Sequence, residues 1–247
     1  MMHFSRKLQE PSWTRRAAPG SRHCALLALG GLELLPDLSG ALYVPDYRSL
    51  LVADLHFEKG SSFLRRGLYI PPFDTRSTLA VLEAAIDRLR PERLIALGDS
   101  FHDGSAGDRI DAVDLARIRS LSDCLEVIWI SGNHDQKLPA GLGGRTAAEV
   151  SLGPLTLRHL PEPVLSGTFE IAGHYHPIAS IVRRGRRLTS RSFVADRSRL
   201  IMPAFGAYTG GLDVRAPEIS SLFSEQAFTA WMIGRSAIYS FSSAVLK

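Results

Sequence analysis

The chain has 247 residues, of which 45% are hydrophobic and 22% are charged, and this composition excludes a largely disordered protein. No uninterrupted apolar run approaches the ~18 residues that span a bilayer, so we expect neither a membrane helix nor a signal peptide. Two cysteines are too few for a disulfide framework and favour a reducing, cytoplasmic setting. The net charge of +4 comes from residues 1–23, while the other residues balance to zero, so bulk charge predicts no coating of nucleic acid.

Residues 1–22 are polar, hold two prolines and lack periodicity, which predicts a disordered basic tail. A transit peptide is the alternative, because such leaders are rich in arginine and poor in acid. No composition shift divides the rest of the chain, so residues 23–247 are expected to form one domain.

Residues 50–130 alternate short apolar runs with amphipathic segments. The runs at 50–53, 94–97 and 127–130 are typical of strands buried on both faces. Between them, leucine and isoleucine recur at helical spacing, which predicts helices over about residues 74–89 and 111–121. This alternation predicts an α/β arrangement with parallel strands.

The second half of the chain is rich in predicted strands. Gly153-Pro154 separates residues 149–152 from 155–158, and an arginine-rich turn at 183–187 separates 178–182 from 188–194, so both pairs are expected to form hairpins. Further strands are predicted at 199–202 and 236–241.

Polar side chains follow each of the three predicted parallel strands. The three sequences are Asp54-Leu55-His56, Gly98-Asp99 and Gly132-Asn133-His134-Asp135. Ligands bind just beyond the carboxyl ends of the strands in open α/β sheets. The alternation of side chains along a strand would turn Asp54 and His56 to the same side. The glycines would let the backbone turn sharply beside an ion.

Histidines continue this pattern in the second half, where His159 stands alone and Gly173-His174-Tyr175-His176 follows. Carboxylate, amide and imidazole ligands suit manganese, iron or zinc in an open site, and the lack of a cysteine run argues against a structural zinc site. Each element alone has an ordinary explanation as a turn aspartate or a core histidine. Four of them in this order, each near a strand end, predict a metal site.

The order D-x-H, G-D, G-N-H-D/E, lone H and G-H-x-H resembles the calcineurin-like metallophosphoesterase superfamily. It runs from Asp54 to His176. Residues 54–62 (DLHFEKGSS), 96–103 (ALGDSFHD) and 202–211 (MPAFGAYTGG) further resemble the bacterial DNA-ligase-associated metallophosphoesterases. That family is implicated in the DNA damage response and described as nucleases. The likeness covers roughly residues 26–240.

The resemblance implies a four-layer α-β-β-α sandwich of two mixed β-sheets flanked by helices. It also implies two divalent metal ions, with Mn²⁺ expected first and Fe²⁺ or Zn²⁺ as alternatives. The implied ligands are Asp54, His56 and His176 for one ion, Asn133, His159 and His174 for the other, and Asp99 bridging both. His134 would face the substrate phosphate and stabilise or protonate the leaving oxygen. Two such ions ~3.5–4 Å apart can supply hydroxide and clamp both oxygens of an in-line displacement.

Four features leave alternatives open. His102 stands where the superfamily often has Asp or Asn, so it either contacts substrate or supports a residue that does. Arg65 either contacts substrate or is an exposed helix residue, and Asp135 either orients His134 or is a turn aspartate. Residues 183–199 carry a local balance of +6 and either grip a phosphate backbone or form a solvated hairpin.

The resulting functional prediction is a metal-dependent phosphodiesterase, and more specifically a DNA endonuclease or exonuclease acting in DNA repair. The alternatives are a phosphomonoesterase or small-nucleotide phosphodiesterase with the same metals, and a non-catalytic scaffold of the same fold. Residues 206–211 lack the Gly-Lys-Ser/Thr ending of a nucleotide loop and are expected beside the metal centre. DNA is the expected partner, with functional links to an ATP-dependent DNA ligase and a helicase, and no membrane association is expected.

Overall fold

The computed structural model describes residues 27–135, 138–163 and 165–247, so the predicted tail over residues 1–22 lies outside the described residues. Within them, the first half of the chain forms a seven-stranded sheet. Its strands, in spatial and chain order, are β1 (Leu27–Leu29), β2 (Leu32–Pro36), β3 (Leu42–Val44), β4 (Ser49–Val52), β5 (Arg93–Leu97), β6 (Glu126–Ile130) and β7 (Arg145–Ala147).

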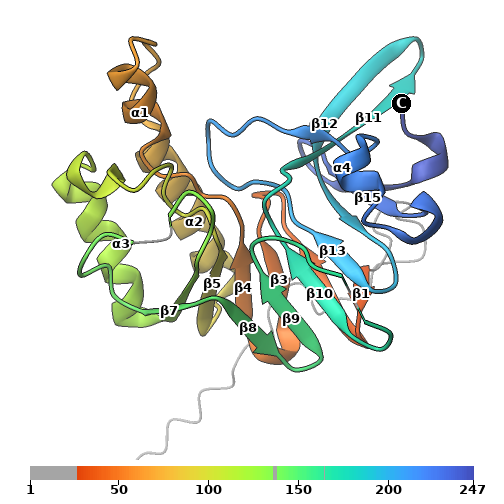
Figure 1. The fold of residues 1–247 in the computed structure, drawn as a ribbon, viewed down its shortest axis with the longest axis horizontal. Coiled ribbons are helices and arrows are strands. Elements are labelled where there is room, and N and C mark those ends of the chain that lie inside the picture. The colour runs from red at the N-terminus through yellow and green to blue at the C-terminus, as the bar shows by residue number, and fades with distance from the viewer. Residues whose placement is uncertain (1–26, 136–137, 164) are drawn as a thin grey trace, which may run out of the picture.

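Strands β4 to β7 run parallel, as the sequence predicts for β4, β5 and β6. Helix α2 (Asp74–Leu89) lies in the crossover from β4 to β5 and α3 (Ala112–Cys124) in that from β5 to β6, because parallel neighbours cannot be joined by a tight turn. Helix α1 (Lys59–Arg65) precedes α2 and projects beyond it (Figure 1). The strands of the first hairpins, β1 to β3, pair antiparallel.

The second half of the chain supplies a mixed sheet with the order β14-β11-β12-β13-β10-β9-β8, and β15 pairs with both β12 and β16. Parallel pairs join β9 to β10, β10 to β13 and β11 to β14. The strands are β8 (Glu149–Leu152), β9 (Leu155–Arg158), β10 (Phe169–Ala172), β11 (Pro177–Arg183), β12 (Arg186–Ala195), β13 (Arg199–Ile201), β14 (Leu212–Asp213), β15 (Thr229–Ile233) and β16 (Ile238–Ser242).

The chain folds into four layers (Figure 1). Buried apolar side chains join these layers. Between the sheets, Leu51 and Ile95 of the first pack in one cluster with Leu157 and Phe193 of the second. The other face of the first sheet packs against α2 and α3, and the outer face of the second packs against the short helix α4 (Pro217–Ser220) and the C-terminal segment. Burial on both faces explains the continuous apolar runs of β4, β5 and β6. The predicted α-β-β-α sandwich is therefore confirmed.

Single-turn 3₁₀ helices lie at Pro45–Tyr47, Ala106–Asp108, Ser224–Gln226 and Ser243–Val245. Among the described residues, every helix is too short or too polar to cross a membrane.

The structure divides the arginine-rich segment at 183–199 into two environments. The turn between β11 and β12 exposes its arginines, whereas Arg199 is buried and its Nε lies 2.5 Å from Glu170 Oε2. Arg191 Nη1 donates to the carbonyl oxygen of Ala204 at 2.9 Å. The segment is therefore not one continuous phosphate-binding surface, because at least two of its arginines support the fold.

Replacing Arg199 with methionine is expected to lower the free energy of unfolding by about 3 kcal/mol, because it leaves the carboxylate of Glu170 buried without its main partner. The loss falls at the low end of the usual range for such a change, since Arg158 Nε still faces Glu170 at 3.5 Å. Urea unfolding followed by circular dichroism measures it. The exposed Arg197→Gln is the control and should change stability by less than about 0.5 kcal/mol. Equal losses in both variants would contradict the prediction.

Candidate metal centre

The predicted site residues meet where the carboxyl ends of strands from both sheets converge on one edge of the sandwich. From the first sheet, Asp54 and His56 follow β4 and Asp99 follows β5. From the second, His159 follows β9, and His174 and His176 follow β10. The structure gathers these six side chains into two groups of three, each with ligand atoms within 4.8 Å of one another.

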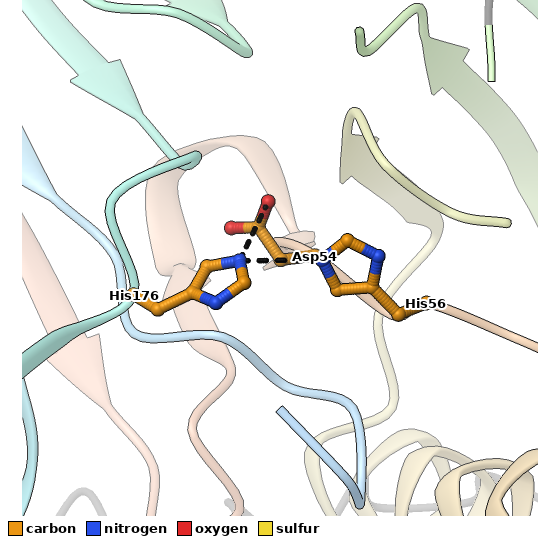
Figure 2. Close-up of side chains that lie close together, drawn as sticks. All are labelled: Asp54, His56 and His176. Atoms are coloured by element: carbon orange, nitrogen blue, oxygen red, sulfur yellow. Dashed lines mark hydrogen bonds and ion pairs between the residues drawn. The ribbon is translucent and has the colours of Figure 1, made fainter. Parts of the chain in front are cut away.

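The first group consists of Asp54, His56 and His176 (Figure 2). The Nε2 atoms of the two histidines face each other at 3.3 Å, and Nε2 of His176 lies 3.4 Å from Oδ1 of Asp54. Asp54 is fully buried, and its Oδ1 has no hydrogen-bond partner among the described residues. Two imidazole nitrogens and a carboxylate oxygen without a hydrogen bond thus point at one small space from two different sheets.

The second group consists of Asp99, His159 and His174. Nε2 of His159 lies 3.1 Å from Nδ1 of His174 and 3.4 Å from Oδ2 of Asp99. The amide oxygen of Asn133 joins them at 2.9 Å from the same nitrogen of His159. A cavity of about 290 Å³ opens beside Asn133 and His159. Every predicted ligand therefore lies in or next to one of the two groups.

His159 is held in one orientation by the backbone. Its Nδ1 donates to the carbonyl oxygen of Leu97 at 2.9 Å, because a carbonyl can only accept, and Nε2 is thereby turned toward Asp99 and Asn133. Glycine is required at position 98, since a Cβ there would lie 2.4 Å from His159 Nδ1. The lone histidine of the sequence pattern is thus positioned as a ligand would be.

The carboxylates and imidazoles of the site shift one another's pKa values. Burial opposes the charged form of His159, but Asp99 and Asp54 raise its pKa to about 9. Burial also works to raise the pKa of Asp99, yet hydrogen bonding to His159 lowers it to about 2. Burial and the neighbouring His176 lower the pKa of His56 to about 2, so its imidazole is neutral.

Facing imidazole nitrogens and a buried carboxylate oxygen without a hydrogen bond suit divalent cations. The two facing imidazole nitrogens of His56 and His176, 3.3 Å apart, repel unless a proton or a cation lies between them. The donor set of carboxylate, amide oxygen and imidazole is one that borderline and hard divalent metals take. The residues present therefore fit a metal centre.

The backbone at this edge is left-handed at five site residues. Positive φ angles between 46° and 72° occur at Asp54, His56, Asp99, His174 and His176. Such angles are unfavourable for residues other than glycine and cluster at functional sites. Asp54 and His56 do meet in one group, but strand alternation is not the cause. Both residues lie past the end of β4, and the left-handed backbone at each of them directs its side chain.

His134 occupies the open side of the site. Its Nδ1 donates to the carbonyl oxygen of His102 at 2.9 Å, which leaves Nε2 3.9 Å from Oδ2 of Asp99. The side chain of His134 is 42% exposed, whereas that of Asp99 is 3% exposed. The rings of His102 and His134 stack with centroids 5.5 Å apart. His134 is thus fixed on one side and accessible on the other.

Asp135 does not orient His134. The carboxylate of Asp135 is buried and accepts backbone N–H groups from Gly132 at 2.9 Å, Ser100 at 2.6 Å and Phe101 at 3.1 Å. It therefore ties the loop after β6 to the loop after β5. Burial raises its pKa. Of the two alternatives for Asp135, the structure supports a turn aspartate, and one that joins two loops.

Two residues are expected from the sequence to contact substrate. His102 lies beside the first ligand group, and Arg65 lies on the exposed surface of α1. The ring of His102 lies 5.5 Å from that of His56, so His102 lines the site. Nη1 of Arg65 approaches Ser105 Oγ at 3.5 Å. The loop at residues 206–211 begins beside the site as expected, since Gly206 N donates to the carbonyl oxygen of Asp54 at 3.2 Å.

The sequence predicts a sharp backbone turn at Gly132, and the structure adds a role that the sequence did not reveal, which is to leave room for Asp99. A Cβ at this position would lie 2.1 Å from Oδ1 of Asp99 and 2.2 Å from its backbone nitrogen. Gly132→Ala should therefore displace Asp99 and weaken divalent-metal affinity by about 10–100-fold, the usual effect of disturbing a residue that holds a ligand. Titration with Mn²⁺ in a calorimeter measures it.

Gly104→Ala is the matched control for Gly132→Ala, because a Cβ at position 104 meets nothing within 4 Å. Its metal affinity should equal that of the unchanged protein. Unaltered Mn²⁺ affinity in Gly132→Ala would show that the contact with Asp99 does not hold this ligand in place.

The fold and the site define a metal-dependent phosphoesterase class, and comparison with known proteins agrees. The family model of the calcineurin-like phosphoesterases matches residues 47–196, and the chain belongs to this family. The chain is 32% identical to a nuclease from Pseudomonas putida, MPE, with a TM-score of 0.68 over 88% of this chain and 99% of that one. It is 15% identical to a phosphoesterase from E. coli, with a TM-score of 0.38 over 80% of this chain and 98% of that one. No curated protein matches the chain.

Proposed function

We propose that this protein is a two-metal phosphodiesterase that hydrolyses DNA. The observation that carries the proposal is the pair of ligand groups at one strand edge, with an accessible histidine beside them. The 32% identity to a nuclease supports DNA as the substrate. One cation would be held by Asp54, His56 and His176, and the other by Asn133, His159 and His174, with Asp99 between them.

Two divalent cations so held supply positive charge for a phosphoryl oxygen and lower the pKa of a water molecule. The chain's own contribution is to orient the ligands and to move a proton. Because Nδ1 of His134 is committed to the carbonyl oxygen of His102, Nε2 is the atom that can carry a proton to the leaving oxygen. Oδ2 of Asp99 lies 3.9 Å from this nitrogen.

Manganese is proposed as the metal, with iron or zinc as alternatives. The donor set combines two aspartates, an asparagine amide and four histidines, and such mixed oxygen and nitrogen ligands suit these ions. A functional association with an ATP-dependent DNA ligase and a helicase stays a prediction, as does a cytoplasmic location.

The test uses protein stripped with a chelator and reloaded with Mn²⁺, Fe²⁺, Zn²⁺ or Mg²⁺. Its substrates are an aryl phosphodiester, an aryl phosphomonoester, and single- and double-stranded DNA. We expect hydrolysis of the diester and of DNA with Mn²⁺, and much slower hydrolysis of the monoester. Hydrolysis of the monoester alone would favour the phosphomonoesterase alternative and contradict the proposal.

His176→Ala and Arg197→Gln serve as matched variants in the same assay. His176 belongs to the first ligand group, and Arg197 lies on an exposed turn. His176→Ala should lose activity and Arg197→Gln should retain it. Activity that survives His176→Ala would place the chemistry elsewhere, and no activity with any metal would favour the scaffold alternative.

A further inference from the structure

Residues 59–73, here termed the α1 arm, expose an unusual amount of apolar surface. Leu64 is 44% exposed, Leu68 57%, Tyr69 87% and Phe73 58%. Single exposed apolar residues are ordinary, but four large ones within ten residues are an unusual density that favours a binding surface. In Figure 1 the arm rises beyond α2 at the edge where the strands end.

The arm is fixed at its base. Ser61 Oγ lies 2.6 Å from Glu58 Oε2, and Thr75 Oγ1 donates to Glu58 Oε1 at 2.9 Å. Arg109 Nε donates to Ser61 Oγ at 2.9 Å, and the guanidinium of Arg109 pairs with Asp103 at 2.9 Å. This polar network holds α1 in place, so its apolar residues are presented by an anchored element.

A row of rings connects the arm to the metal centre. His134 stacks on His102, and the ring of His102 lies 5.9 Å from that of Phe63 in α1. The amino group of Lys59 lies 5.9 Å from the centre of the Phe63 ring. The base of the arm therefore lies next to the open side of the site, where His134 stands.

The charge of the arm complements a polyanion. Its basic residues are Lys59, Arg65 and Arg66, and residues 59–73 contain no acid. Arg65 and Arg66 are both exposed. Guanidinium groups bind phosphate through two hydrogen bonds, and exposed aromatic rings stack on bases.

We propose that the α1 arm binds an unpaired stretch of the nucleic acid strand that is cleaved at the metal centre, with Tyr69 and Phe73 stacking on bases and Arg65 and Arg66 contacting phosphates. The proposal rests on the proposed function and assigns to the arm the residues that hold the strand beside the metal centre. Paired bases stack on one another within a duplex, so these rings reach base faces only where pairing is absent.

Binding to a fluorescent 12-nucleotide oligo-dT, measured by anisotropy in EDTA, tests the arm without hydrolysis. Tyr69→Ala combined with Phe73→Ala should weaken binding by about tenfold or more, because each stacked base adds appreciably to affinity. Arg65→Gln combined with Arg66→Gln should reduce the slope of log affinity against log salt by about 1.4, for two lost phosphate contacts. Leu165→Ala, which truncates a side chain that is 74% exposed, should bind as the unchanged protein does.

Kinetics then separate substrate binding from a structural defect. The Tyr69 and Phe73 double variant should raise KM for single-stranded DNA about tenfold and leave kcat/KM for an aryl phosphodiester unchanged within about twofold. Equal losses on both substrates, or unchanged oligo-dT binding, would overturn the proposal. Loss of binding to phosphatidylglycerol vesicles without loss of oligo-dT binding would also overturn it and assign the arm to a membrane surface.

The two proposals can fail separately. If the unchanged protein binds oligo-dT through the arm but cleaves no DNA with any metal, the proposed function is contradicted and the arm's role in binding is supported. If the protein cleaves DNA and the arm variants cleave it equally well, the proposed function stands and the arm proposal is overturned.

Discussion

His134→Ala is expected to lower kcat for phosphodiester hydrolysis by about 10²–10⁴-fold, the usual contribution of a general acid. The reason is that the Nε2 atom of His134 faces the open side of the site while Nδ1 is held by the carbonyl oxygen of His102. If this group protonates the leaving oxygen, the loss should be small for a nitrophenyl ester and large for an alkyl or phenyl ester. Steady-state kinetics with such a series of diesters measures the difference.

Metal content is the control for His134→Ala. The side chain lies outside both ligand groups, so bound Mn²⁺ should match that of the unchanged protein. An equal loss of kcat across all leaving groups would contradict proton donation and leave charge stabilisation as the role of His134. Loss of metal would instead make His134 a ligand.

Asp99→Asn should weaken binding of divalent cations by at least about 10³-fold, because one charge pair ~4 Å apart is worth about 4 kcal/mol at an effective dielectric of 20. The side chains have nearly the same shape, and Asn can still accept the His134 backbone N–H that Asp99 Oδ1 accepts at 2.9 Å. The fold should therefore persist while hydrolysis is lost. Calorimetric titration with Mn²⁺ and circular dichroism measure the two effects.

Asp103→Asn is the matched control for Asp99→Asn. Asp103 pairs with Arg109 rather than with the ligand groups. Although burial works in the opposite direction, hydrogen bonds from Arg109 and Ser105 hold the pKa of Asp103 well below its usual value. The lowered pKa means that the ionised carboxylate of Asp103 adds to the free energy of unfolding above the pKa that Asp103 has in the unfolded chain. This contribution is lost as the pH falls toward the lowered pKa. The control should bind Mn²⁺ normally. Full metal binding by Asp99→Asn would contradict the role given to Asp99.

The central elements of the fold could be predicted from the sequence because their signals are local. Strands β4, β5 and β6 are apolar runs buried on both faces, and α2 shows one apolar face. The strands β1 to β3 did not stand out, since they have three to five residues each and the glycine pair at 30–31, which forms their first turn, looks like an interruption. Helix α1 could not be predicted, because its sequence shows no apolar periodicity.

The membership of the site could be predicted from the order of its motifs, but its geometry could not. The division of ligands into two groups depends on which strands of the two sheets lie opposite each other, and no local pattern encodes that. The link between Asp135 and three backbone amides is likewise a contact between separate loops. The left-handed backbone at Asp54 and His56 replaced the strand alternation that the spacing suggested.

Each ligand group draws on both sheets, since Asp54 and Asp99 come from the first and His159, His174 and His176 from the second. A cation in either group would therefore act as a removable cross-link at one end of the sandwich. A ligand present at 100 times its dissociation constant adds about 2.7 kcal/mol to the stability of the folded state. Chelation would thus weaken the packing of the two sheets at this end of the sandwich. The fraction of folded protein in a cell would then depend on the concentration of available metal, even without substrate.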